Sequence, residues 1–503
     1  MVNDAYAVTI LHRVLIAVAA SLLVLAILRR LLSLWVAWVL AAWWAILPIN
    51  YDTLYEVHLF ALLPELAAVL IALSWSGLRM RAAVFGVLLG TAVLVRNEMI
   101  VATAVWAAAW TAYEVRERRR EEGIAWRRIA RAAAIPVLVV ALLAGLVVAS
   151  SPDAGSLRSL SESKHAYNVC QIYTFGYEQR HSDYTGSPWT DCEPLMRRDF
   201  GENRPTLTAA LLANPGAIAE HFLWNVRLSP YAVQLLLFDR MSGDSSHDPD
   251  YVPVRTGSVA GGIGLAVITV FLIGGAFLLW RDRRHWWEEW IGDRGWGWLA
   301  LGALALTALT VMIWQRPRPS YLFSLEVLIL AAIGMCAMAY ADRWPRLQRL
   351  SAAPPLLAVV LIVAVPRHYV SGYETPQIGR PDRPVKAMVD RLQPFREQLR
   401  GDATHLLATY SGAGCSYIGR ADPCTAVDWD QVLNEQPGAT PKQILQASGA
   451  DFIYLDALDL QNPAFAAVAR AARETGWEMA AGAQNEDRWE LLERPQPRTQ
   501  TRS

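Results

Sequence analysis

The sequence predicts an α-helical polytopic membrane bundle of about ten spans, followed by a small α/β soluble domain. Of its 503 residues, 54% are hydrophobic and only 18% are charged, whereas soluble proteins average about 25% charged residues. Apolar runs recur at close to the roughly 20 residues that cross a bilayer. The 46 basic and 46 acidic residues leave no net charge that would attract nucleic acid. A multi-pass membrane protein without a nucleic-acid partner is the resulting prediction.

The apolar runs define the candidate spans. By length and composition these are 8–28, 31–49, 56–75, 82–95, 99–113, 132–150, 258–280, 296–314, 321–340 and 352–366. The fourth and fifth are short and are separated by Arg96-Asn97-Glu98. Charged side chains at membrane depth are costly and mark functional sites by default. If two short helices meet at a membrane face, Arg96 and Glu98 lie at the interface.

Basic clusters predict which way the spans run. Under the positive-inside rule they are cytoplasmic, and they fall at Arg29-Arg30, Arg79 with Arg81, 116–131, 281–284 and 343–349. The outward segments are then 50–55, 96–98, 151–256, 315–320 and 367–503. We therefore expect residues 1–366 to form the membrane domain, with a large outward loop of amphipathic helices at 151–256.

Four of the five cysteines occur in pairs within the outward segments. Cys170 and Cys192 share one segment, Cys415 and Cys424 share another, and Cys336 lies alone in a span. Disulfides form in oxidising compartments outside the cytoplasm. Two local disulfides are therefore expected, although spacing alone leaves the pairing open, and four free thiols remain the alternative.

Residues 367–494 are expected to form an extracytoplasmic α/β domain, with a disordered tail at 495–503. Strands are predicted at 405–410, 451–456 and 487–493, and helices at 382–399, 440–447 and 463–474. This alternation of strands and helices predicts a domain with its own core.

Several stretches resemble one enzyme family. The glycine-spaced run 86–98, ending in Arg96-Asn97-Glu98, resembles the helix ending in Arg-Pro-Glu in bacterial membrane glycosyltransferases of the GT-C superfamily. Asn97 stands where that pattern often has Pro. Residues 47–56 resemble the acidic stretch at the mouth of an early helix, 212–225 the outward amphipathic segment, and 315–321 the Arg-rich loop before a late helix. The soluble tail also resembles the outward domain found in many members.

The resemblance is to the polyprenyl-phosphate-sugar-dependent group, which includes protein O-mannosyltransferases and lipid A aminoarabinose transferases. It implies an inverting transfer of a sugar from a polyprenyl phosphate donor to a lipid, glycan or protein acceptor. The implied location is the outward face of the bacterial inner membrane. In the family the donor phosphate leaves, an acidic residue in the first outward loop acts as base, and assistance by a divalent metal ion is left open.

The amino terminus departs from the family pattern. Members have a first span and an outward loop carrying that acidic residue before the helix that matches 8–28. The outward position of the amino terminus, deduced from charge, independently predicts a missing span and loop upstream of Met1. An incorrect start site, a truncation and loss of the catalytic loop remain open. Asp4 is the one acidic residue before the first span and is kept as a candidate base.

Asp52 and Glu56 are the further candidates for the base. Four residues apart at the start of a helix, they would share a face at the water-facing end of a cavity, where a base must reach the acceptor hydroxyl. The alternative is that they complement the helix dipole.

Arg96, Arg316 and Arg318 fall at outward span ends, where guanidinium groups could bind the donor phosphate bidentately. Tyr321 completes this candidate phosphate-binding set, and Glu98 is a neighbouring cavity candidate. The alternatives are arginines that extend to lipid headgroups, or a weak surface pair of Arg96 with Glu98.

Four more residues are candidates for the cavity. Glu65 and Glu326 lie deeper within spans, where an ionisable group is usually paired or faces a water-filled cavity. His221 and Asn225 are expected on an amphipathic face more often than as ligands. No zinc spacing, P-loop or Rossmann pattern occurs in the sequence, so the identity of any metal is left unknown.

Two other functions stay open. A transporter or flippase of a lipid-linked glycan would use Glu65 and Glu326 as relay residues, although no inverted repeat is found across the halves. A catalytically inactive GT-C relative would bind the lipid-linked sugar or a partner protein. Membrane lipids are expected as partners in every case.

Overall fold

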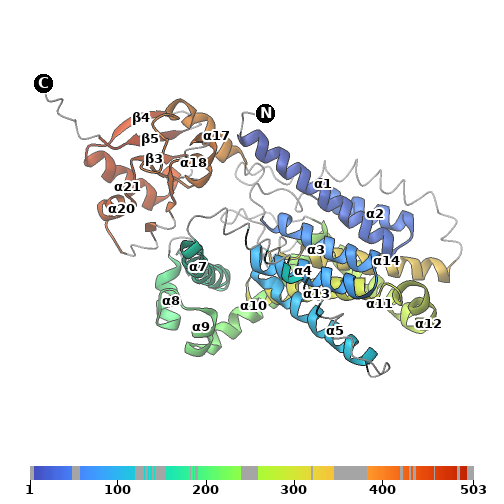
Figure 1. Ribbon diagram of the computed structural model, residues 1–503. Coiled ribbons are helices and arrows are strands. Elements are labelled where there is room, and N and C mark those ends of the chain that lie inside the picture. Colours follow the sequence, from blue (N-terminus) through green and yellow to red (C-terminus); the bar gives the residue numbers. More distant parts are fainter. Residues whose placement is uncertain are drawn as a thin grey trace. The chain divides into compact units, whose positions relative to one another are not determined.

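A computed structural model describes residues 5–47, 57–118, 154–181, 191–238, 259–315, 321–344, 382–409 and most of 411–495, with isolated positions between these ranges. The chain divides into two compact units. One comprises Met1–Leu11, Lys164–Ile218 and Arg380–Ser503, and the other His12–Ser163 and Ala219–Gly379. We call the second unit the helical unit, because its described residues are helical apart from short turns (Figure 1).

The helical unit is built from apolar helices. Its main described helices are most of α1 (Ala5–Leu31), α2 (Leu34–Ile46), α3 (Val57–Ser74), α4 (Gly77–Leu94), α5 (Ile100–Arg118), most of α10 (Pro215–Phe238), α11 (Val259–Arg281), α13 (Gly295–Trp314) and α14 (Phe323–Arg343). Long helices of this composition suit a bilayer, because they satisfy every backbone polar group internally.

Five of the described helices are long and apolar enough to cross a membrane. These windows are Val14–Leu31, Gly77–Leu94, Gly261–Arg281, Gly295–Trp314 and Phe323–Arg343. Leu34–Ile46 and Phe60–Ser74 are apolar but shorter. The predicted span 352–366 lies outside the described residues, as does most of 132–150. The prediction of ten spans is therefore not confirmed. The coarser prediction of a mostly helical protein that is compatible with a membrane is confirmed.

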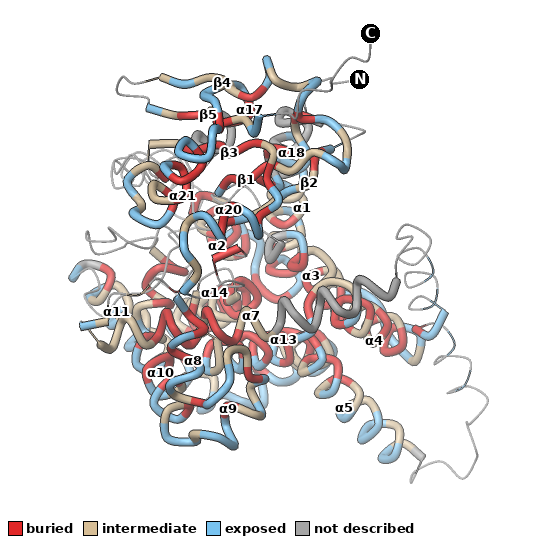
Figure 2. Tube along the Cα trace, turned by 90° about the vertical axis from the view of Figure 1, so that its left-hand side faces the viewer, coloured by how far each residue is buried: buried red, intermediate tan, exposed pale blue. Residues whose placement is uncertain are grey.

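Helix α13 lies at the centre of the unit and packs against α3, α5 and α14. Small residues allow the close approach. A Cβ on Gly297 would lie 2.0 Å from Leu73 Cδ2, and one on Gly334 would lie 2.3 Å from Leu32 Cδ1. The missing side chains at these glycines therefore leave room for leucine side chains of neighbouring segments, and small residues of this kind are enriched where membrane helices pack. Buried residues accordingly gather on α13 and α14 (Figure 2).

Helices α4 and α5 form an antiparallel hairpin around a 3₁₀ turn, η2 (Asn97–Met99). At the open end, Arg81 Nη2 donates to Glu114 Oε1 at 2.9 Å and Trp106 Nε1 donates to the Arg81 carbonyl at 3.0 Å. The other end is the turn that contains Arg96. Two separate helices in place of one long helix, the alternative that the sequence allowed, are therefore present, with the charged triplet at their junction.

The carboxyl-terminal domain contains a five-stranded sheet in the order β2-β1-β3-β5-β4. The strands are β1 (His405–Leu407), β2 (Thr425–Val427), β3 (Phe452–Leu455), β4 (Glu478–Ala483) and β5 (Trp489–Glu493). β1 pairs in parallel with β2 and β3, whereas β5 pairs antiparallel with β3 and β4. All four residues of β3 are buried, as expected for a central strand.

The helices of this domain are α17 (Asp382–Leu392), α18 (Ser411–Gly419), α20 (Pro441–Ser448) and α21 (Pro463–Glu474). Helix α20 begins with a capping box in which Thr440 and Gln443 each bond the other's backbone amide. A core around Trp429, Ile453 and Val468 joins sheet and helices. The predicted helix at 382–399 ends earlier, because a 3₁₀ turn containing Pro394 follows Leu392.

Between Lys164 and Ile218 the chain forms most of α7 (Ala154–Arg180), then α8 (Cys192–Phe200) and α9 (Leu207–Ala213). A disulfide joins Cys170 on α7 to Cys192 at the start of α8, with a Cα–Cα distance of 5.5 Å. Tyr173 also donates a 2.7 Å hydrogen bond to Asp199. A second disulfide joins Cys415 to Cys424 in the sheet domain, and Cys336 is a buried free thiol.

Candidate functional site

The candidate site of the helical unit begins at Arg96, in the turn between α4 and α5. The peptide chain leaves α4 at Val95 and is extended at Arg96, with φ −145° and ψ 107°. Arg96 Nε and Nη2 both donate to Glu98 Oε1, at 2.8 and 2.5 Å. The Arg96 side chain is only 9% exposed. Arg96 is therefore buried, whereas Glu98 is half-buried with 20% of its side chain exposed, so the pair is not a fully exposed surface ion pair.

Arg96 also contacts the loop before α14. Its guanidinium carbon lies 5.4 Å from the ring centroid of Tyr321, a cation–π distance. Tyr321 is held in turn by a 3.0 Å hydrogen bond from its amide to the Arg318 carbonyl. Two motifs that are distant in sequence, the Arg-Asn-Glu turn and the Arg-rich loop, therefore meet in space.

Glu65 on α3 belongs to the same cluster. It is 3% exposed, it is hydrogen-bonded to the Ser324 hydroxyl, and it interacts electrostatically with Arg96 and Glu98. Pro64 precedes it within the helix, and a proline there removes one backbone hydrogen bond and disturbs the preceding turn. A carboxylate this deeply buried needs partners, and Ser324 and Arg96 supply them.

His221 and Asn225 lie one helical turn apart on α10 and face the last turn of α13. His221 Nε2 lies 3.1 Å from the Trp314 carbonyl oxygen. Asn225 Nδ2 donates to the Ile313 carbonyl at 3.0 Å and to the Gln315 carbonyl. The last carbonyls of a helix have no partner within the helix. These two side chains therefore cap the carboxyl end of α13. The expectation that they lie on an amphipathic face did not predict this capping role.

The α13–α14 loop is consequently held at both ends. At its start the carbonyls of α13 bind His221 and Asn225, and at its end Tyr321 contacts Arg96 while Ser324 bonds Glu65. Glu326, within the first turn of α14, is fully buried, and its amide donates to the Leu322 carbonyl at 2.9 Å. Side chains from α3, α4–α5, α10 and α14 thus surround one loop.

Several of the predicted site residues cannot be located. Asp4, Asp52, Glu56 and Arg316 lie outside the described residues. The structure places Arg96, Glu98 and Tyr321 together with Glu65 and Ser324, and Arg318 lies on the same loop as Tyr321. Of the three arginines expected to bind phosphate, the structure describes Arg96, which contacts Tyr321, and Arg318, which precedes Tyr321 by three positions.

The charge of the cluster limits what it can bind as it stands. Glu65 and Glu98 surround Arg96, so the arginine already has carboxylate partners. A phosphate group would have to replace Glu98 at the guanidinium, or add to its remaining edge, to gain the bidentate geometry that arginine offers. Within the described residues no three His, Cys, Asp or Glu side chains are grouped as metal ligands.

A second polar cluster follows the parallel strands of the sheet domain. Thr409 and Asp459 are bonded to each other through the hydroxyl and Oδ1, and Ser411 Oγ donates to Asp428 Oδ1 at 2.5 Å. The Asp456 amide donates to Asp459 Oδ2 at 3.1 Å. Burial, reinforced by the charge of Asp456, raises the pKa of Asp459 to about 7. Ligands often bind at this edge of parallel sheets, but here the hydroxyls and amides of the domain itself satisfy the carboxylates.

Ser324 was missed by the sequence reasoning. Its signal was weak: a single hydroxyl two residues before Glu326 in an apolar run. The basic turn 281–284 indicates only topology in the sequence, whereas in the structure it also lines a pocket. In both cases the partners come from other helices, so spacing along the chain could not show them.

Comparisons with protein families, with curated proteins and with solved structures found no significant match to this chain.

Proposed function

We propose that the chain transfers a sugar from a polyprenyl-phosphate-linked donor to a lipid, glycan or protein acceptor on the extracytoplasmic face of a membrane. The observation that carries the proposal is the contact between Arg96 and Tyr321. It joins two of the segments that resemble GT-C glycosyltransferases, at the ends of helices of membrane-spanning character. A basic group and a phenol at such a helix end suit the phosphate of a lipid-linked donor.

In the proposed reaction, the acceptor atom attacks the anomeric carbon while the bond from that carbon to the phosphate oxygen breaks. The phosphate leaves with the electron pair as polyprenyl phosphate, and a carboxylate takes the acceptor proton. Attack opposite the leaving group inverts the anomeric configuration. Arg96, with Arg316 and Arg318, would stabilise the charge that develops on the leaving phosphate, and Tyr321 would position Arg96.

Asp52, Glu56 and Asp4 are the candidates for the base in this proposal. A base must come within hydrogen-bond reach of the acceptor, so at least one of them should be essential for transfer but dispensable for donor binding. Glu98 is assigned a different role. It orients Arg96 in the absence of donor and yields one guanidinium edge when the phosphate arrives.

The test uses the full chain reconstituted in proteoliposomes with radiolabelled undecaprenyl-phosphate-linked sugars. Donor retention by the Arg96→Ala/Arg316→Ala/Arg318→Ala triple variant should fall at least tenfold, and that of an Arg470→Gln control should not change. Arg470 is an exposed residue of α21. Equal donor binding by the triple variant and the control would rule out the phosphate site.

The base is tested separately by the Asp52→Asn/Glu56→Gln double variant and by Asp4→Asn. Loss of transfer with donor binding retained would assign the base to the altered position. Transfer that persists in all of these variants would remove the base assignments. Donor binding without transfer by the unaltered chain would favour the inactive relative.

A second candidate function rests on the burial of Glu65 and Glu326. Both carboxyl groups lie within helices of the apolar bundle, at 3% and 0% exposure, as proton-relay residues of a transporter do. A flippase would move a fluorescent polyprenyl-linked glycan across the bilayer without changing it chemically. Glu65→Gln and Glu326→Gln would abolish that movement, whereas a transferase would release polyprenyl phosphate in the same vesicles.

A further inference from the structure

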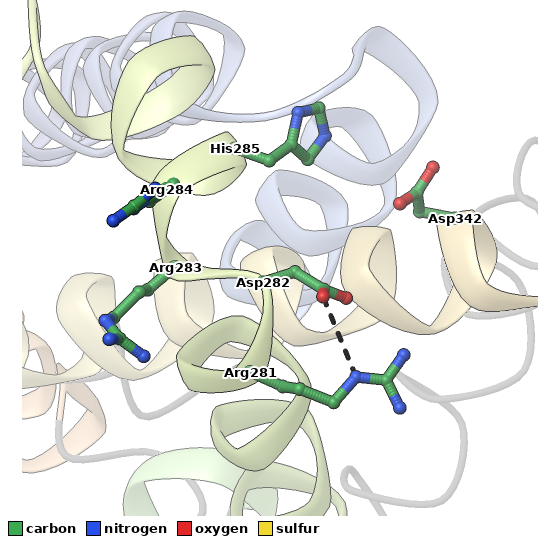
Figure 3. A pocket seen from close by; sticks show the side chains of 6 residues that line it. All are labelled: Arg281, Asp282, Arg283, Arg284, His285 and Asp342. Atoms are coloured by element: carbon green, nitrogen blue, oxygen red, sulfur yellow. Dashed lines mark ion pairs between the residues drawn. The ribbon is translucent and has the colours of Figure 1, made fainter.

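The described residues contain an open pocket of about 520 Å³ at the end of α11 (Figure 3). One side of its lining is the continuous turn region formed by the end of α11 and the start of α12 (Arg283–Trp286), with Arg281, Asp282, Arg283, Arg284 and His285. Asp342 near the end of α14 completes the lining. The two helices pack against each other. The lining contains three arginines and one histidine but only two aspartates, so it carries excess positive charge.

The three arginines of this turn are not equivalent. Arg281 Nε lies 3.7 Å from Asp282 Oδ1 and is partly neutralised. Arg283 and Arg284 form no ion pair with any residue that the structure describes, and in Figure 3 their side chains extend to the same side of the turn. The Arg283 guanidinium carbon also lies 5.9 Å from the Trp280 ring centroid. Two adjacent cationic groups are therefore available to an anion.

An apolar stripe on α11 leads to this pocket. Its side chains are more than half exposed at helical spacing, with Val259 at 80%, Val270 at 71% and Trp280 at 64%. Ile263, Val267, Ile273 and Phe277 continue the stripe between them. Only 11% of the apolar window of α11 is buried, against 61% for α14. One face of α11 is thus apolar along its whole length and ends at the arginines.

Three tryptophans lie within two positions of pocket-lining residues along the chain. Trp280 precedes the turn, Trp287 follows α12 and is 61% exposed, and Trp344 follows α14 and is 49% exposed. Tryptophan is enriched where the headgroups of a bilayer begin. Along α11 the apolar stripe, Trp280 and the arginines follow one another in the order of acyl chain, interface and headgroup of a lipid.

We propose that this pocket binds the phosphate of an anionic phospholipid, with the acyl chains along the exposed stripe of α11. Arg283 and Arg284 hold the phosphate, and Arg281 with Asp282 fixes the turn. Basic pockets between membrane helices bind anionic headgroups in this way. A second copy of the chain on the same face would bring two like-charged turns together if it packed symmetrically, so charge favours the lipid.

The full chain in neutral detergent is titrated with dioleoyl phosphatidylglycerol, dioleoyl phosphatidylcholine or inorganic phosphate, and thermal unfolding is followed. A ligand that binds the folded state raises the midpoint with its concentration. Phosphatidylglycerol should raise the midpoint more than phosphatidylcholine does. Inorganic phosphate should have no effect at the same concentration, because it lacks the chains.

The Arg283→Gln/Arg284→Gln variant should need at least tenfold more phosphatidylglycerol for half of the effect. Arg470→Gln/Arg494→Gln, which removes two exposed arginines of the sheet domain, is the control and should respond like the unaltered chain. Asp342→Asn removes a negative charge from the lining and should strengthen the response, which provides a test even if the arginine variant does not fold.

Equal responses to the two phospholipids, or an unchanged response after both the arginine and the aspartate substitutions, would overturn the proposal. A response to inorganic phosphate equal to that of phosphatidylglycerol would overturn the lipid as the ligand and leave a site for a free anion. If the midpoint rises only under conditions in which sedimentation experiments show a dimer, the stripe on α11 would be assigned to a second copy of the chain, and the lipid proposal would be overturned.

Discussion

The guanidinium carbon of Arg96 lies 5.4 Å from the ring centroid of Tyr321, and the same guanidinium donates two hydrogen bonds to Glu98. Arg96 therefore connects the α4–α5 turn to the loop before α14. Glu65 and Ser324 make a second connection between α3 and the start of α14. The loop that bears Arg318 is thus fixed by charged residues from two other elements.

Breaking the Arg96–Glu98 pair should destabilise the helical unit. Removal of one partner of a fully buried ion pair leaves the other charge uncompensated at a cost of about 3–5 kcal/mol. The cost here should be smaller, because 20% of the Glu98 side chain is exposed to solvent. Arg96→Gln and Glu98→Gln should each lower the thermal midpoint in detergent. The double variant should lower the midpoint by less than the sum of the two single effects. A strictly additive double variant would contradict the pairing.

Asn225→Leu should weaken the cap on α13. The substitution keeps the branched shape of the side chain but removes the donors to the Ile313 and Gln315 carbonyls, and unsatisfied buried acceptors cost about 1–3 kcal/mol. Asn225→Asp should cost more, because a carboxylate cannot donate and repels the carbonyls. Ser229→Ala, one turn further along α10, is the control. Thermal unfolding in detergent measures all three, and equal midpoints would refute the cap.

Much of this architecture could be predicted from local pattern. Apolar runs marked α11, α13 and α14, and the alternation of strand and helix marked β1, β3, β5, α20 and α21. Strands β2 and β4 were missed. β2 is as short as β1 but has no buried residue, and β4 is rich in Ala and Gly, with an exposed or half-buried pattern. Such strands are defined by pairing with neighbours more than by their own sequence.

The candidate site was less predictable for a related reason. The importance of Arg96 and Glu65 followed from the cost of charge in an apolar run, which is a local property. Their partners Tyr321 and Ser324 belong to a different helix pair, so no spacing rule connects them. His221 and Asn225 bind carbonyls of α13, and nothing on α10 itself indicates that those carbonyls are near.

Removal of the disulfides should cost different amounts. Cys170 and Cys192 are separated by 22 positions, and Cys415 and Cys424 by 9. In the chain-entropy description a disulfide stabilises the folded state by about 2–4 kcal/mol, and this stabilisation increases with the length of the loop that the disulfide closes. The Cys170→Ala/Cys192→Ala variant should therefore lower the thermal midpoint of its own unit at least as much as Cys415→Ala/Cys424→Ala does. Addition of a reducing agent should lower the midpoint of the unaltered chain and leave the quadruple variant unchanged.

The stability of the sheet domain should fall as the pH rises from about 4 to 7. Burial raises the pKa of Asp459 from 3.8 to about 7 in the folded chain, so in this window the folded state binds a proton that the unfolded state has released. The free energy of unfolding then decreases with pH, by an amount on the order of a few kcal/mol at about 1.4 kcal/mol per pKa unit. Hydrogen exchange of the β1 and β3 amides in the full chain, corrected for intrinsic rates, should show this loss of stability.

Asp459→Asn should remove most of this pH dependence, because the amide cannot ionise and can still accept a hydrogen bond from Thr409. Thr409→Val is the matched test of the pKa itself: the Thr409 hydroxyl favours the charged form, so its removal should raise the pKa further and move the loss to higher pH. Protection that is constant from pH 4 to 7 in the unaltered chain would show that Asp459 is ionised throughout.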